Sequence, residues 1–329
     1  MNAVGIRAFE YVDWERLRGK TVFLTGITGL LGFTIFKLLN QAEAELELDI
    51  TLICLVRDRN KAVGRLSSAG MVRLKLVYME GSVTDRMQSI SVDYVIHCAA
   101  DTASKSFLDS PAKVMRTSIE GTINVLEFAR ESKASGMIYL SSMEVYGRAE
   151  KGNVLTEQMV GTFDPTNTRD CYPIGKIACE ELCHSYMEEY GFPVKVARLS
   201  QVIGEEYSEN DVRFPALMIR CAKEKKDIVL KTRGLSERCY ISSMDAAGAI
   251  LLILLKGTAG DIYNVADEES YCSVSELAER IAAENGIKVV YDIAPPSESG
   301  FPPDSYLHLD TQKLRSLGWK RVAGIRYRY

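Results

Sequence analysis

Short apolar runs alternate with longer amphipathic stretches through the first two hundred residues. The apolar runs, rich in Val, Ile and Leu, predict strands at 20–25, 49–56, 72–78, 93–98, 136–141 and 194–199. Between them, apolar positions recur at helical spacing and predict helices at 29–45, 60–68, 111–133 and 172–190, with a short turn near 84–90. Strands that are apolar on both faces and joined by helices indicate a parallel sheet covered on both sides.

The first strand leads into a loop with Gly26, Gly29 and Gly32, and a helical pattern begins inside that loop. These glycines suit a tight turn, a close approach of the backbone to a ligand, and close packing of helix on strand, in that order. A pyrophosphate can lie there against the amide groups and the positive dipole end of the helix. A purely structural glycine turn is the alternative, but the strand before and the helix after favour phosphate binding.

The pattern changes after residue 200. Residues 203–213 are polar and irregular, helices are predicted at 214–224, 243–256 and 273–285, and short strands at 228–230, 263–265 and 288–291. A loop follows with Pro295, Pro296, Pro302 and Pro303. We therefore expect an α/β fold in which a doubly wound parallel Rossmann sheet carries a smaller, interleaved C-terminal α/β substrate lobe.

The expected domain division assigns 1–199 and 235–265 to an NAD(P)-binding Rossmann domain and 200–234 and 266–329 to a substrate-binding lobe. A substrate is expected in the cleft between the two. Residues 1–19 form a polar lead-in whose Trp14 and Leu17 are expected to pack on the edge of the sheet.

Composition narrows the class of protein. With 329 residues, 47% hydrophobic and 26% charged, the chain has the composition of a soluble globular protein of one large or two modest domains. A formal net charge of −4 gives no general attraction to nucleic acid or to an anionic membrane, and neither is expected as a partner. The longest apolar run, 249–255, is too short to cross a bilayer and predicts a buried helix.

The eight cysteines are scattered, with no C-x-x-C pair and no secretory segment at the N-terminus. They indicate reduced thiols and a cytoplasmic protein. Cys179, Cys183 and His184 are close in sequence, but His184 leaves the helix face that the two cysteines share, so no metal is expected. His184 and His308 are expected at the surface or between helices.

A second group of polar residues follows the strand at 136–141. Ser142 comes at its carboxyl end, and Tyr172 and Lys176 are four residues apart on a predicted helix, so both face the same way. A nearby ammonium lowers the pKa of a phenol towards the working pH of a general base. Such a pair is common by chance, and its significance comes from its combination with the glycine loop.

Taken together, these segments are similar to those of the extended short-chain dehydrogenase/reductases, in particular the nucleotide-sugar epimerases, dehydratases and decarboxylases. The resemblance covers nearly the whole chain and rests on 25–32, 97–100, 121–126, 141–147, Tyr172 with Lys176, Arg198 before Gly204, 238–241 and 260–266. Segment 168–176, Asp211–Arg213 and Arg238 look most like the UDP-glucuronate decarboxylase type. The paired helices at 111–133 and 172–190 match those that form a dimer interface in the family, so a homodimer is expected.

The resemblance implies roles for individual residues. Tyr172 would be the base at the sugar 4-hydroxyl, Ser142 would position the 4-oxygen, and Lys176 would hold the nicotinamide ribose. Arg213 and Arg238 would contact the nucleotide diphosphate. The residues expected to bind NAD(P), besides Tyr172 and Lys176, are Gly26, Thr28, Gly29, Leu30, Leu31, Arg57, Ser82, Val83, Cys98, Ala99 and Ala100.

Three positions depart from the family. Ser82 stands where the family usually has the Asp that holds the adenine, and Ser118 stands where it usually has Asn. Met143 occupies the position at which the 4,6-dehydratases carry an Asp that protonates the leaving hydroxyl, which argues against an ordinary 4,6-dehydratase.

The end of the second strand bears on the choice of cofactor. Arg57 follows this strand, where the NAD enzymes of the family usually have an acidic residue for the ribose, and an arginine suits a 2′-phosphate. Arg59 and Lys61 add positive charge, and we expect NADP. The alternative is that Asp58 reaches the ribose while Arg57 stacks on the adenine, which would keep NAD.

Glu144 follows Ser142 by two residues and is expected to face the same sugar ring. Once C4 is a ketone, the protons on the neighbouring carbons are acidic, and a carboxylate can remove or return one. A surface carboxylate at a strand end is the alternative. We therefore expect an enzyme that works through a 4-keto nucleotide sugar. An NADPH-dependent keto reductase of the same family, or a cofactor-binding regulator without catalysis, is the alternative function.

Overall fold

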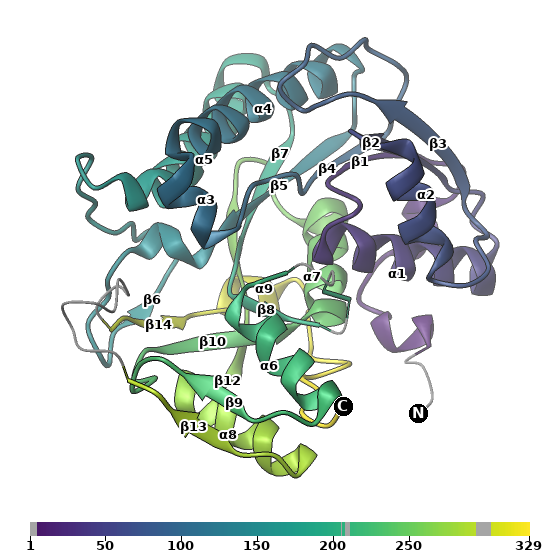
Figure 1. Cartoon of the computed structure of the whole chain (residues 1–329). Coiled ribbons are helices and arrows are strands. Elements are labelled where there is room, and N and C mark those ends of the chain that lie inside the picture. Colours follow the sequence, from purple (N-terminus) through teal and green to yellow (C-terminus); the bar gives the residue numbers. More distant parts are fainter. Residues whose placement is uncertain (1–4, 205, 208–210, 294–303) are drawn as a thin grey trace.

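The computed structural model describes residues 5–204, 206–207, 211–293 and 304–329 (Figure 1). Its central sheet has seven parallel strands in the order β3-β2-β1-β4-β5-β7-β11. Their bounds are β1 Thr21–Thr25, β2 Thr51–Val56, β3 Lys75–Glu80, β4 Tyr94–His97, β5 Gly136–Ser142, β7 Val194–Leu199 and β11 Ile262–Val265. The order reverses between β1 and β4, and ligands of such sheets bind at the carboxyl ends beside this reversal.

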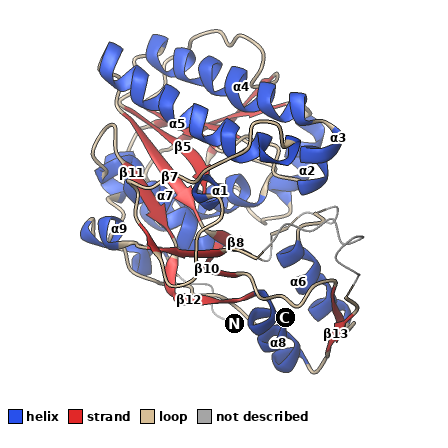
Figure 2. Cartoon of the chain, turned by 90° about the vertical axis from the view of Figure 1, so that its left-hand side faces the viewer, coloured by secondary structure: helices blue, strands red, loops and turns tan. Residues whose placement is uncertain are grey.

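Helices cover both faces of the sheet (Figures 1 and 2). Alternate side chains of β1 point to opposite faces, so Leu24 packs in the cluster with the first group of helices and Phe23 in the cluster with the second. The first group is α1 (Leu30–Leu46), α2 (Arg59–Ser67) and α7 (Ser243–Lys256). The second is α4 (Pro111–Glu131) and α5 (Cys171–Tyr190). The doubly wound α/β prediction is confirmed.

The N-terminal lead-in forms two short 3₁₀ helices, η1 (Ile6–Phe9) and η2 (Trp14–Leu17). That Trp14 and Leu17 pack on the sheet edge stays a prediction, since their cluster also holds Val22 of β1. They are buried in the cluster of α1 and α7, and a methyl group added at Gly248 of α7 would lie 2.8 Å from the Phe9 ring. The lead-in therefore covers part of α7. The buried helix predicted at 249–255 is confirmed within α7.

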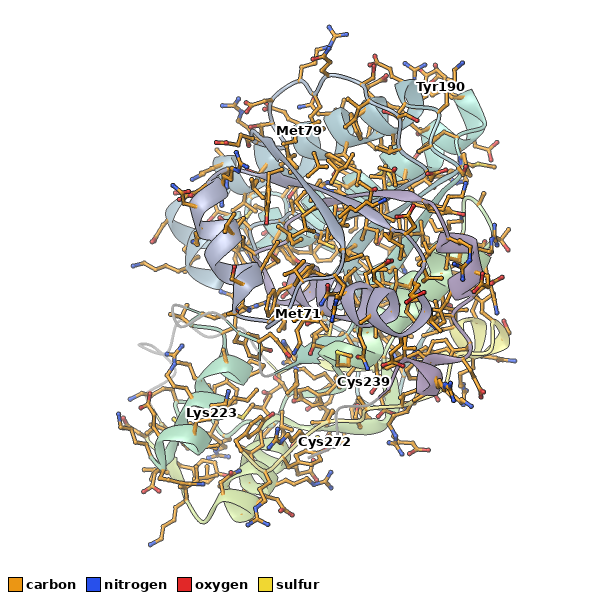
Figure 3. All side chains as sticks on the ribbon, turned by 90° about the vertical axis from the view of Figure 1, so that its right-hand side faces the viewer. Met71, Met79, Tyr190, Lys223, Cys239 and Cys272 are labelled. Carbon is orange, nitrogen blue, oxygen red and sulfur yellow. The ribbon has the colours of Figure 1, made fainter. Side chains whose placement is uncertain are left out.

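A second lobe lies below the central sheet in Figure 1. Its sheet has the order β12-β10-β14-β6, with β8 also paired to β10, and β9 pairs with β13 in a separate ribbon. Helices α6 (Phe214–Glu224) and α8 (Val274–Asn285) pack on this ribbon, and Lys223 and Cys272 lie in this lobe, far from Tyr190 at the end of α5 (Figure 3). The strands are β6 Val154–Leu155, β8 Gln201–Ile203, β9 Ile228–Leu230, β10 Glu237–Ser242, β12 Asp267–Ser273, β13 Val289–Tyr291 and β14 Tyr306–Leu309.

Several elements differ from the sequence-based expectation. The strand predicted at 72–78 is β3, Lys75–Glu80, and β6, β8, β10, β12 and β14 were not predicted. The remaining short helices are η3 Met143–Tyr146, η4 Thr168–Asp170, α3 Ser104–Asp109 and α9 Gln312–Ser316. The proposed domain division remains a prediction, although β6 and β10 fall in ranges assigned to the larger domain and pair in the second sheet. The loop with Pro295, Pro296, Pro302 and Pro303 lies outside the described residues.

In the described part of the chain, no helix is both long and apolar enough to span a membrane.

Candidate active site

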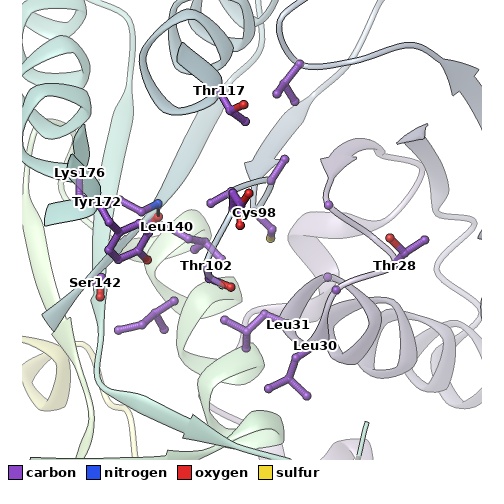
Figure 4. Close-up of a pocket in the computed structure, with 18 of the residues that line it drawn as sticks. Thr28, Leu30, Leu31, Cys98, Thr102, Thr117, Leu140, Ser142, Tyr172 and Lys176 are labelled. Carbon is purple, nitrogen blue, oxygen red and sulfur yellow. Dashed lines mark hydrogen bonds between the residues drawn. The ribbon is translucent and has the colours of Figure 1, made fainter. Parts of the chain in front are cut away.

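A cleft of about 1330 Å³ opens at the carboxyl ends of the central strands. In Figure 4, Thr28, Leu30 and Leu31 lie at one end, Ser142, Tyr172 and Lys176 at the other, and Cys98 and Thr102 between them. Every residue predicted for the site lines this one cleft, from Gly26 in the glycine loop to Arg213 and Arg238 in the second lobe. The roles given to these residues remain predictions.

The glycine loop is shaped for close contact. Gly26 has φ +75°, and a methyl group added there would lie 2.8 Å from the backbone nitrogen of Ala99. At Gly32 an added methyl group would lie 2.3 Å from the carbonyl oxygen of Gly26. The N-terminus of α1 therefore sits directly against the loop, and the amides of its first turn, which lack partners within the helix, border the cleft. This cradle fits a dinucleotide pyrophosphate.

The end of β2 presents positive charge to the same part of the cleft. Arg57 and Lys61 line it, whereas the guanidinium of Arg59 lies 5.6 Å from the ring centroid of Tyr78. The Asp58 carboxylate caps α2 by accepting a hydrogen bond from the Lys61 amide at 2.9 Å. Asp58 lines this part of the cleft as well, so both residues lie where a ribose substituent could reach them.

Tyr172 is held at the opposite end. Its ring stacks on Phe107 of α3, with centroids 4.7 Å apart and an interplanar angle of 15°. Ser142 is the last residue of β5, and its hydroxyl accepts a hydrogen bond from the Glu144 amide at 3.2 Å. Burial raises the pKa of Tyr172 well above its ordinary value, and the negative charge of Glu144 raises it further, while a Ser142 hydrogen bond and the Arg213 charge lower it.

Lys176 is buried one turn further along α5 and donates a hydrogen bond to the Leu140 carbonyl oxygen at 2.6 Å. Its ammonium lies 5.7 Å from the Tyr172 ring centroid, and burial lowers its pKa to about 8. The sequence predicted a lowered phenol pKa, but this structure shows a raised one. The difference arises because desolvation of the phenolate outweighs the attraction of nearby positive groups.

Glu144 points into the cleft, where solvent reaches it but protein surrounds it closely. This desolvation raises the pKa of its carboxyl, and the charges of Arg238 and Arg169 oppose the rise. Arg238 comes from β10, and its Nε is buried without a hydrogen-bond partner among the described residues. Buried donors of this kind are rare in proteins, so the site suits an anionic ligand at Arg238.

Arg213 stands at the N-terminus of α6 and pairs with Asp211, with Nε 3.0 Å from Oδ1. Its guanidinium also lies 5.3 Å from the Tyr207 ring centroid. Asp211 thus holds the arginine in place in the wall of the cleft.

Sequence analysis missed several residues of the cleft. Asp101, Thr102, Lys113, Arg116 and Arg169 all line it. Arg169 had a usable signal, since it lies three residues before Tyr172, in η4 directly before α5. The α4 residues gave no signal, because only the observed packing shows which helix face borders the cleft.

The structure shows the surroundings of the three residues that depart from the family pattern. The Ser82 hydroxyl contacts that of Thr84 at 2.9 Å, beside the cleft. Ser118 is buried beneath α5, and its Cβ would lie 3.5 Å from a methyl group added at Gly175. Met143 is buried against Val145 and Leu155, although it reaches the cleft wall.

The cysteine and histidine residues lie mostly away from this chemistry. None of the eight cysteines is paired in a disulfide, and His184 is exposed. Among the described residues, no three His, Cys, Asp or Glu side chains are grouped to hold a metal ion. His308 stacks on Tyr271, with ring centroids 4.4 Å apart.

The chain matches the model of the NAD dependent epimerase/dehydratase family over residues 22–266. This match spans well over half of its length, and the chain belongs to that family. The predicted membership is confirmed.

Two curated relatives illustrate the range of activities in this family. UDP-glucuronic acid decarboxylase 1 of Xenopus tropicalis is 26% identical over 199 residues, which cover 60% of this chain and 47% of that protein. The chain thus spans about half the length of that relative. The dTDP-D-glucose 4,6-dehydratase of Homo sapiens is 25% identical over 262 residues, which cover 74% and 70%.

Solved structures share the fold. The UDP-glucose 4-epimerase of Thermus thermophilus, in complex with NAD, has a TM-score of 0.74 at 20% identity, covering 93% of this chain and 95% of that one. The UDP-N-acetylglucosamine 4-epimerase of Methanobrevibacter ruminantium has a TM-score of 0.74 at 21% identity, covering 92% and 93%. At such low identity these likenesses show the fold alone.

Proposed function

We propose that the protein is an NAD(P)-dependent enzyme that modifies a nucleotide sugar through a 4-keto intermediate. The observation that carries this proposal is the arrangement of one cleft, with a glycine cradle at one end and Ser142, Tyr172 and Lys176 at the other. A protein that only bound the cofactor would have no physical need for all three side chains.

The chain's own residues would divide the work. A bound nicotinamide dinucleotide supplies a hydride acceptor for the sugar carbon. Tyr172 would remove the proton of the 4-hydroxyl, and Ser142 would hold the 4-oxygen in place. Lys176 would orient the nicotinamide ribose, and its positive charge would favour the phenolate of Tyr172 once the cofactor and the substrate are bound.

Glu144 is proposed for the step after oxidation. A ketone at C4 acidifies the protons on C3 and C5, and a carboxylate in the cleft can take or return one. The raised pKa of Glu144 brings its proton affinity closer to that required near neutral pH. This step separates the dehydratase and decarboxylase chemistries from simple 4-epimerisation. In 4-epimerisation the keto sugar only has to rotate in the site before the hydride returns to its other face.

Arg213 and Arg238 are proposed to hold the diphosphate of the substrate. Both are cationic, both border the cleft from the second lobe, and Arg238 carries the buried unpaired donor. Planar guanidinium groups bind phosphate oxygens in a bidentate manner. The named relatives act on UDP- and dTDP-linked sugars, which agrees with such a substrate.

NADP is the proposed cofactor, with Arg57 and Lys61 at its 2′-phosphate. The use of Asp58 as the α2 cap supports this choice, since the cap engages one of the two carboxylate oxygens, Oδ1, that a ribose hydroxyl would need.

An NADPH-dependent keto reductase is the second candidate, because Ser142, Tyr172 and Lys176 serve that reaction equally well. Glu144 and Arg169 in the cleft favour the reaction through a 4-keto intermediate, since a reductase needs no carboxylate beside the sugar ring. A regulator without catalysis remains the alternative from another class.

Products from four nucleotide sugars, separated by chromatography and identified by mass spectrometry, test the proposal. UDP-glucuronate, UDP-glucose, UDP-N-acetylglucosamine and dTDP-glucose are each incubated with the protein and either NAD or NADP. We expect one of them to lose water or carbon dioxide, or to change its stereochemistry. A reductase instead leaves all four unchanged and consumes NADPH with a 4-keto sugar.

We also propose that two copies pair through α4 and α5 and that the enzyme works in the cytoplasm. Ile123 of α4 and Ile174 and Ala178 of α5 are half-buried apolar side chains on these helices. The unpaired thiols suit a reducing compartment.

A further inference from the structure

A buried ion pair lies directly behind the active site. Glu180 of α5 and Arg198 of β7 are 6% and 1% exposed. The guanidinium donates from Nη2 to Glu180 Oε2 at 2.7 Å and from Nε to Oε1 at 3.1 Å. Charges so deeply buried are costly unless each is paired and hydrogen-bonded, which is the case here.

The pair joins four parts of the site. Glu180 also accepts a hydrogen bond from Ser141, the neighbour of Ser142, and it lies one turn beyond Lys176 and two turns beyond Tyr172. Arg198 donates from Nη1 to the carbonyl oxygens of Glu157 and Met159, at 3.0 and 2.9 Å. One carboxylate therefore ties α5 to the end of β5, while its partner ties β7 to the loop that leads towards η4.

Lys176 precedes Glu180 by one turn of α5, so the two side chains lie on the same face of the helix. Its ammonium is buried, and the titratable groups around it come from β4, β5 and α5, namely His97, Cys98, Tyr139, Tyr172, Cys179 and Cys183, besides Glu180 and the Arg198 of β7 that pairs with it. Of these, Glu180 is the carboxylate, and it is the group able to carry a full negative charge near neutral pH. The burial of Lys176 by itself favours the neutral amine.

We propose that Glu180 is a positioning residue: held by Arg198, it fixes α5 against the end of β5 and keeps the buried Lys176 ammonium charged beside Tyr172. For its catalytic meaning this proposal rests on the proposed function. The effect of Glu180 on the charge of Lys176 can be tested without any substrate.

The test is an NMR titration of Lys176 in the full-length chain labelled with ¹³Cε-lysine, its signal assigned by its loss in Lys176→Met. In Glu180→Gln, which keeps the shape but removes the charge, we expect the Lys176 titration midpoint to fall by about one pH unit or more. Glu181→Gln, next along α5 but exposed, is the matched control and should leave the midpoint unchanged. An unchanged midpoint in Glu180→Gln would overturn the proposal.

A double variant separates charge from folding. Buried ion pairs can often be replaced by apolar residues of similar volume without loss of stability, so Glu180→Met/Arg198→Met should fold even if Glu180→Gln does not. We expect a melting temperature close to that of the wild type and a Lys176 titration midpoint below that of the wild type. A double variant with the wild-type midpoint would mean that the pair is only structural. Should no nucleotide sugar be turned over, the proposed function fails while the Lys176 result still stands.

Discussion

Burial changes the acid–base behaviour of three side chains in the cleft, each towards its neutral form. The pKa values of Tyr172 and Glu144 are raised, and that of Lys176 is lowered to about 8. The negative charge of Glu144 adds to the rise at Tyr172, so a protonated Glu144 makes deprotonation of the phenol easier. Tyr172 and Glu144 are therefore suited to act one after the other.

Glu144→Gln tests this order of events. The variant keeps a similar shape but cannot exchange a proton, so we expect C4 oxidation to survive while the next step stalls and the 4-keto sugar accumulates. Wild-type turnover in deuterated water should place deuterium on a carbon next to C4. Product without deuterium, together with normal turnover by Glu144→Gln, would remove Glu144 from the proposed mechanism.

Arg57→Ala tests the choice of cofactor. Loss of a charge-assisted contact costs about 1.5–3 kcal/mol, so NADP should bind roughly 10 to 100 times more weakly while NAD binding changes little. Calorimetry measures both affinities. Arg59→Ala is the matched control, since Arg59 faces Tyr78 instead of the cleft, and it should change neither affinity. Wild-type protein that binds NAD as tightly as NADP would contradict the assignment.

At the scale of elements, the loop between β1 and α1 decides whether the cradle can form. Gly32→Ala would bring a methyl group to 2.3 Å from the Gly26 carbonyl oxygen, so the helix must move away from the loop. We expect a loss of about 1–3 kcal/mol in unfolding free energy and weaker cofactor binding.

Gly64→Ala is the control for that substitution. Gly64 lies inside α2, and an added methyl group there would meet nothing within 4 Å. Alanine should therefore stabilise the helix by up to about 1 kcal/mol. Urea unfolding measures both effects, and equal stabilities for the two variants would contradict this account of the glycine loop.

The sequence predicted the elements whose signal is local. The apolar run of β1 and its glycine loop, and the long amphipathic helices α4 and α5, are set by residues close together in the chain. The strand β12 is polar, and it is a strand because it pairs with β10 across some thirty residues, which no local pattern reveals. The direction of the Tyr172 pKa was missed for a similar reason, since burial depends on packing contributed by α3.

At the scale of the whole molecule, the cleft needs both lobes, because the glycine loop comes from one and Arg238 from the other. The proposed dimer would pair the outer helices α4 and α5 with those of a second copy. Ile123→Glu would place a charge in that interface, and we expect sedimentation to change from twice the 36.6 kDa chain mass to one chain mass.

The control for the interface is Val63→Glu, which adds the same charge at an exposed position of α2 and should leave the assembly unchanged. A wild-type protein that sediments as a single chain would rule out the proposed pairing.

The most direct test of the proposed chemistry is the absorbance of reduced nicotinamide after the protein, loaded with NAD or NADP, is mixed with each of the four nucleotide sugars. We predict a rise with at least one sugar for the wild type and for Glu144→Gln. In Tyr172→Phe we predict no rise, although its fold and its cofactor affinity should be retained, because only one hydroxyl is lost from a preformed site. Reduction by Tyr172→Phe at the wild-type rate, or no reduction with any of the four sugars, would contradict oxidation at C4 by this site.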